Sequence, residues 1–124
     1  MEYRLATVVD WPAISEYVHG RDYFMPIDPA TLGGHWLIAV DAAGVLHGTI
    51  WFFGEVPHAY VDYWAGSHII AARLGAILEK MLRANGVRSV RGVIKQNNDS
   101  AVRLADALGM FTRSGDYLLV HRSI

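Results

Sequence analysis

Three strand-like runs follow one another closely between residues 36 and 65, and they restrict the folds open to this chain. Residues 36–40 and 45–53 are apolar and rich in β-branched and aromatic side chains, and the short turn DAAG between them predicts a β-hairpin. A break around Pro57 separates this hairpin from a third run, residues 58–65. Strands joined by connections this short indicate an antiparallel meander.

An amphipathic helix is predicted directly after the meander, at residues 69–84, with Asn85-Gly86 ending it. Its apolar stripe comprises Ile70, Leu74, Ile77, Leu78, Met81, Leu82 and Ala84. The remaining patterns predict strands at residues 3–9, 89–96, 111–114 and 117–122, and helices at 11–19, capped by Asp10, and 99–110. The order β-α-β-β-β-α-β-α-β-β predicts one mixed α/β domain over residues 1–124, with a mostly antiparallel central sheet of six or seven strands flanked by three or four helices.

Charge and composition exclude several classes of protein. The net charge is −1 at pH 7, so no overall basic field would attract nucleic acid or an anionic membrane, and we expect neither as a partner. The chain has no cysteine, which excludes disulfides and thiolate metal sites, fits a reducing compartment and leads us to expect a cytoplasmic protein. The histidines lack the spacing of metal ligands, so no metal site is expected.

The segment NNDSAVRLADALGMF, residues 97–111, joins a predicted strand to a predicted helix. Asn98 can cap the helix, and Gly109 lies where a left-handed residue would end it, so a structural explanation accounts for the pattern. The segment also resembles the N-x-x-A-[IV]-x-L-Y-x-x-x-G-F signature of the GNAT (Gcn5-related N-acetyltransferase) family. The matching positions are Asn98, Ala101, Val102, Leu104, Gly109 and Met110. The order of elements is similar to that of the family along nearly the whole chain.

The resemblance implies an acetyl-CoA-dependent N-acetyltransferase that acts on a primary amine of a small molecule or protein, by direct attack in a ternary complex. In this family the fourth and fifth strands splay apart at a bulge, and the pantetheine arm of acetyl-CoA pairs between them. Here these strands are residues 58–65 and 89–96. The main chain of Asp62 and Trp64 and the side chain of Asn98 would then contact the cofactor arm.

The pyrophosphate loop of the family, [QR]-x-x-G-x-[GA], is degenerate in this chain. One register places Ile69, Ala72 and Leu74 on its signature positions and keeps the apolar stripe in phase, whereas a second reads residues 73–76, RLGA, as a shortened loop. The resemblance assigns the pyrophosphate to backbone N–H groups in residues 70–75, namely those of Ile70, Ala71, Ala72, Arg73, Leu74 and Gly75.

Two signatures of the family are therefore missing, because the tyrosine that often serves as its general acid is also replaced, by Ala105. They leave two alternatives open. The first is a catalytically inactive GNAT-fold binding or assembly protein. The second is an interaction protein whose aromatic surface docks a partner, with a homodimer through the last strand as one form of that assembly.

Acetyl transfer requires a neutral amine, so a base must remove a proton. Strand alternation predicts one face that carries His58, Tyr60, Asp62 and Trp64. His58 falls at about the position where some relatives carry a glutamate base, and Glu55 in the preceding turn is the next candidate. Asp62 would extend a proton path on the same face. The structural alternatives are a histidine at the edge of a turn and a carboxylate held by backbone groups or an arginine.

Overall fold

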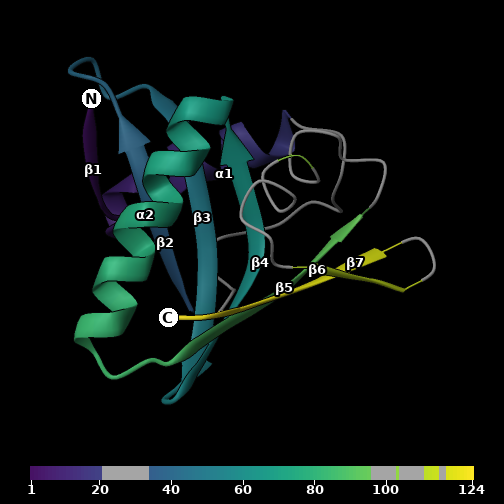
Figure 1. Ribbon diagram of the computed structural model, residues 1–124. Coiled ribbons are helices and arrows are strands. Elements are labelled where there is room, and N and C mark those ends of the chain that lie inside the picture. The colour runs from purple at the N-terminus through teal and green to yellow at the C-terminus, as the bar shows by residue number, and fades with distance from the viewer. Residues whose placement is uncertain (21–33, 96–102, 104–110, 115–116) are drawn as a thin grey trace.

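The central element of the protein is a seven-stranded sheet in the order β1-β2-β3-β4-β5-β7-β6 (Figure 1). The computed structural model describes residues 1–20, 34–95, 103, 111–114 and 117–124. The strands are β1 (Glu2–Leu5), β2 (His35–Val40), β3 (Leu46–Glu55), β4 (His58–Gly66), β5 (Ser89–Lys95), β6 (Phe111–Ser114) and β7 (Tyr117–Ser123). Neighbouring strands are antiparallel except β4 and β5, which are parallel. The predicted mixed α/β fold with a mostly antiparallel sheet is confirmed.

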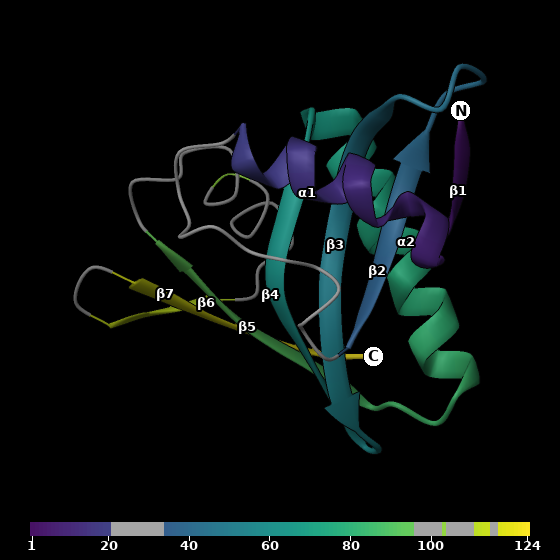
Figure 2. The same cartoon turned by 180° about the vertical axis from the view of Figure 1, so that it is seen from behind.

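Two helices cover opposite faces of the sheet, and each encloses a core. Helix α2 (His68–Ala84) packs on one face through Leu74, Leu78 and Leu82, and helix α1 (Trp11–His19) packs on the other through Ile14 and Val18 (Figures 1 and 2). Neither helix has the length and apolar character that crossing a membrane requires. The predicted helix over residues 99–110 lies outside the described residues, apart from Arg103.

The first strand is shorter than predicted, because the chain turns at Thr7. Residues 3–9 were expected to be one strand, but β1 ends at Leu5 and a 3-10 turn, η1 (Val8–Asp10), follows. The Asp10 carboxylate does not cap α1. It accepts hydrogen bonds from Thr7 N at 2.8 Å and from the Arg4 guanidinium at 2.7 and 2.9 Å, which fixes the turn.

The position of the last strand in the sheet does not fit the expectation that this strand joins two copies of the chain. Strand β7 lies between β5 and β6, and Tyr117–Val120 pair with β6, so this part of β7 is not a free edge. The edge strands of the described sheet are β1 and β6.

Helix α2 and β4 are held together by Trp64. Its indole N–H donates to the carbonyl of Ala71 at 2.9 Å, and its ring lies over Gly75, where an added Cβ would be 2.6 Å from Trp64 Cζ2. The buried residues of the helix are Ala71, Leu74, Leu78 and Leu82, and the last three belong to the predicted stripe. Ile70, Ile77 and Met81 of the stripe pack against the same core but are only partly buried.

We expect Gly75→Ala to destabilise the protein although alanine favours a helix. The helical gain is about 0.5–1 kcal/mol, whereas forcing the indole aside costs roughly 1–3 kcal/mol, so we expect a net loss of about 1–2 kcal/mol. Urea unfolding measures it. In a Trp64→Leu background the same substitution should be neutral or stabilising, and an unchanged loss in that background would show that Trp64 is not the obstacle.

A second prediction concerns Asp10, whose pKa is lowered from 3.8 to about 2, chiefly by the hydrogen bonds from Arg4. Asp10→Asn should lower the free energy of unfolding by about 1–2 kcal/mol at pH 7. Because the folded-state pKa is depressed, this stabilisation is complete well above pH 3.8 and is lost as the pH falls toward 2. Urea unfolding at pH 7 and at pH 3 tests the trend, and Glu16→Gln, at an exposed carboxylate on α1, is the control.

Candidate functional site

Strand β4 contains one extra residue, Asp62, relative to β3. Val61 pairs with Phe52 and Tyr63 pairs with Trp51, so no residue of β3 lies opposite Asp62. An extra residue of this kind is a β-bulge, which interrupts the ladder and leaves main-chain groups without strand partners. Asp62 is exposed.

The bulge exchanges the two faces of β4. Before it, Ala59 and Val61 face α2, but after it Tyr63 and Ala65 face α1 and Trp64 faces α2. The predicted face carrying His58, Tyr60, Asp62 and Trp64 is therefore wrong: His58 and Tyr60 lie on the face opposite α2, whereas Trp64 packs against α2. Period-2 alternation fails because one inserted residue reverses its phase.

Strands β4 and β5 separate at this bulge. Their parallel pairing runs from His58–Ser89 to Val61–Gly92 and stops there, although β4 continues to Gly66 and β5 to Lys95. Beyond this point β5 keeps its pairing with β7 and turns away from β4 (Figure 1). The facing edges of both strands thus carry N–H and C=O groups that no longer pair with each other. The predicted splay of the fourth and fifth strands is confirmed.

The N-terminus of α2 lies at the open end of this splay, because β4 leads directly into it (Figure 1). The Ser67 hydroxyl accepts from Ile70 N at 3.3 Å, and Ala71 N donates to Ser67 O at 2.8 Å. The N–H groups of His68 and Ile69 precede the first helical hydrogen bond, so they face out of the helix end, where the helix dipole favours an anion.

This geometry corrects the assignment of the pyrophosphate to N–H groups of residues 70–75. The helix already begins at His68, so the N–H groups of residues 71–75 are used inside it. Leu74 is fully buried. The absence of a side chain at Gly75 makes room for the Trp64 ring, so close approach of a phosphate is not needed to account for this glycine. Arg73 is exposed, so its charge is available near the helix end.

The predicted bases lie where β4 is still paired. His58 Nδ1 is hydrogen-bonded to the Ser89 hydroxyl on β5, four residues before the bulge. Glu55 pairs with His58 through the backbone at the β3–β4 turn, and its side chain is not among those described. Asn98 lies outside the described residues. Sequence reasoning missed Ser89 and Ser67, although a serine just before an apolar helical pattern is a usual cap signal.

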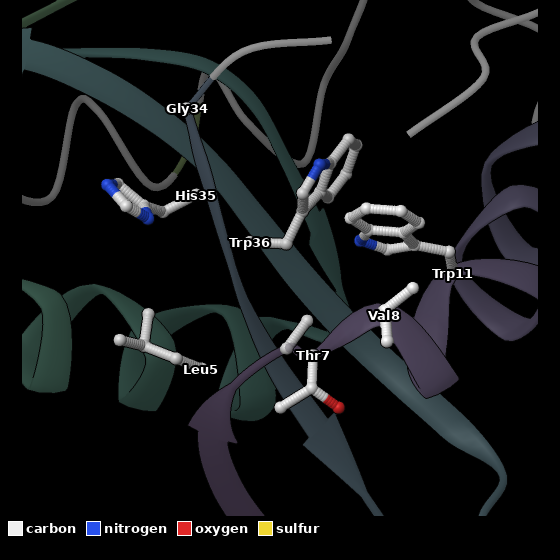
Figure 3. Close-up of a pocket in the computed structure, with 8 residues that line it drawn as sticks. Leu5, Thr7, Val8, Trp11, Gly34, His35 and Trp36 are labelled. Carbon is white, nitrogen blue, oxygen red and sulfur yellow. The ribbon is translucent and has the colours of Figure 1, made fainter. Parts of the chain in front are cut away.

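A separate pocket of about 180 Å³ lies near the β1 edge of the sheet, between β1, η1 and the start of β2 (Figure 3). Leu5, Val8, Trp11 and Trp36 contribute to its wall, and the buried Trp36 indole N–H has no hydrogen-bond partner among the residues that the structure describes. Strand β3 stands between β2 and β4, so this pocket is not part of the opening at the bulge. In the described part of the chain, no three histidine or acidic side chains gather as a metal site would require.

Comparisons with known proteins identify the fold. Neither protein-family models nor curated proteins gave a match to the sequence. Among solved structures, the ribosomal-protein-S18-alanine N-acetyltransferase of Escherichia coli has a TM-score of 0.78 at 15% identity, over 99% of this chain and 94% of that one. A GNAT-family acetyltransferase of Staphylococcus aureus has a TM-score of 0.78 at 11% identity, over 98% and 99% of the two chains.

A third similar structure contains a ligand. PaiA N-acetyltransferase of Thermoplasma acidophilum, in complex with coenzyme A, has a TM-score of 0.72 at 13% identity and covers 100% of both chains. At such low identities the likeness establishes the fold, which is that of the GNAT acetyltransferases.

Proposed function

We propose that this chain, which has the GNAT fold, is an acyltransferase that moves the acetyl group of acetyl-CoA to a primary amine of a small molecule or protein. The separation of β4 from β5 beyond Val61–Gly92 carries the proposal. It presents two strand edges to one slender ligand, and the amide groups of pantetheine are the kind of partner that adds to such an edge. The coenzyme A complex of the structurally similar PaiA enzyme supports this choice of donor.

In the proposed reaction the amine nitrogen attacks the thioester carbonyl, the new C–N bond forms and the C–S bond breaks, releasing CoA. Main-chain groups of Asp62 and Trp64 pair with the pantetheine arm, and an N–H group at the bulge donates to the thioester oxygen as negative charge develops there. His58, four residues from the bulge, takes the proton of the amine through a chain of water molecules, with Glu55 and Asp62 as the alternative bases. The thiolate leaves without a dedicated acid, because its conjugate thiol is a comparatively strong acid.

The pyrophosphate is assigned to the end of α2. The N–H groups of His68 and Ile69, assisted by the positive end of the helix dipole, donate to phosphate oxygens. Arg73, one turn further along, adds charge, and Asn98 contacts the cofactor arm. These backbone donors replace the glycine loop of the family.

A second candidate is a GNAT-fold binding or assembly protein without catalytic activity. The observation in its favour is that helix α2 already begins at His68, so regular helix replaces the phosphate-binding loop of the family. The apolar side chain of Ile69 is also 69% exposed at the N-terminal end of this helix. Binding of CoA separates the two candidates.

We expect acetyl-CoA and CoA to raise the melting temperature, because a ligand of the folded state stabilises it. Arg73→Gln should weaken CoA binding about tenfold at low salt, since one charge-assisted contact to phosphate is lost. Lys80→Gln, an exposed cation on the same helix, is the matched control. An unchanged melting temperature at millimolar CoA would reject the enzyme proposal, and a thiol-release assay with a panel of amines then separates an enzyme from a CoA binder.

A further prediction concerns the base. His58→Ala should lower kcat about a hundredfold or more near neutral pH, and the loss should shrink at higher pH as the free amine becomes abundant. The pH dependence of kcat from thiol release measures this, with His19→Ala, at an exposed position on α1, as the control. An unchanged pH profile would exclude His58, and Glu55→Gln and Asp62→Asn would then be compared in the same assay.

A further inference from the structure

A row of four side chains crosses the sheet just before the bulge. Phe53 on β3 pairs with Tyr60 on β4, Tyr60 with Arg91 on β5, and Arg91 with His121 on β7. Residues that pair across strands share a face, and neighbouring strands lie roughly 4.8 Å apart. We call these four residues the aromatic–basic row. Its face is the one opposite α2, because Ala59, Val61 and Val90, which alternate with row residues, pack against the α2 core.

The aromatic half of the row is a rigid, open platform. The rings of Phe53 and Tyr60 stack with centroids 5.6 Å apart and planes 21° apart, yet the two residues are 38% and 37% exposed. Phe53 also contacts Trp51, which stacks on the buried Trp36. Exposed aromatic rings fixed from below in this way offer a flat apolar surface for another ring.

The basic half of the row carries the permanent charge of Arg91. Arg91 and His121 are both exposed, and neither forms an ion pair with another described residue. A planar guanidinium beside a flat apolar surface is suited to a carboxylate, which it binds with two parallel hydrogen bonds.

Among the described residues, the row is left uncovered because α1 lies over a different part of β4. The core under α1 includes Tyr63 and Ala65, which lie beyond the bulge, whereas Tyr60 lies before it. Tyr60 is two residues from Asp62, or roughly 7 Å along the strand. A compact molecule can therefore place an amine at the bulge, a ring on Tyr60 and an anionic group on Arg91 at the same time.

We propose that the acceptor is a free aromatic α-amino acid, whose ring lies on Phe53 and Tyr60 and whose carboxylate binds Arg91. This inference rests on the proposed function for the position of the reacting amine. An apolar amine without a carboxylate would leave Arg91 unused, and an aliphatic amino acid would leave the platform uncovered.

The test compares L-phenylalanine with two analogues that each lack one feature. L-phenylalaninamide lacks the negative charge, and L-alanine lacks the ring. In thiol-release assays with acetyl-CoA, kcat/KM should be about tenfold or more higher for phenylalanine than for either analogue. Arg91→Gln should abolish the preference over the amide while leaving the amide itself unaffected, and Tyr60→Leu should abolish the preference over alanine. Arg88→Gln, at an exposed arginine outside the row, should keep both preferences.

Equal use of all three amines by the wild-type protein would overturn the inference, and so would a uniform loss in Arg91→Gln. Thermal melts of each variant show whether it is folded. Ligand-observed NMR of phenylalanine and its amide, without acetyl-CoA, gives a readout that does not depend on transfer. If none of the three amines releases thiol although CoA raises the melting temperature, phenylalanine is not the acceptor and the inference is overturned. If CoA does not bind, the proposed function fails, and NMR then decides whether the row is a site for phenylalanine: binding that Arg91→Gln abolishes supports the site, and absence of binding rejects it.

Discussion

The single extra residue at Asp62 determines the arrangement of most functional parts of the molecule. Because this residue has no partner on β3, the faces of β4 exchange at that point: the strand contributes Ala59 to the core under α2 and Tyr63 to the core under α1. The same irregularity coincides with the end of pairing between β4 and β5, at Val61. One local insertion thus links the packing of both cores to the opening of the sheet.

The two layers of helix hold this opening in place. Trp64 faces α2 only because the bulge reverses the alternation of side chains along β4. Its indole N–H donates to the carbonyl of Ala71 and its ring packs on Gly75, which holds β4 against the helix. Helix α2 consequently starts where β4 ends and runs back along the sheet, so that its first free N–H groups lie at the open end (Figure 1). On the other face, the part of β4 before the bulge stays clear of α1. The proposed donor site and the proposed acceptor surface both depend on these two packing arrangements.

Much of the fold was predictable because its signals are local. The hairpin of β2 and β3, the helix that ends before Gly86 and the splay implied by the GNAT resemblance all agree with the structure. The errors occur where specific side-chain or backbone contacts override the local pattern. Val8 and Val9 have strand propensity, but Arg4 and Thr7 bind Asp10 and turn the chain. The GNAT resemblance assigned residues 70–75 to a degenerate pyrophosphate loop, yet they lie inside helix α2.

The sequence by itself determined the order of the described elements, the apolar faces of helices α1 and α2 and the resemblance of the pattern to GNAT proteins, because propensity and periodicity depend on residues that are close together in the chain. Only the tertiary structure decided which face each side chain of β4 takes, since a bulge depends on how β3 and β4 pair and leaves no mark in composition. It also showed that Gly75 leaves room for the Trp64 ring. Strand pairing, finally, brought Phe53, Tyr60, Arg91 and His121 into one row. Those residues are far apart in the chain and become neighbours only through strand pairing.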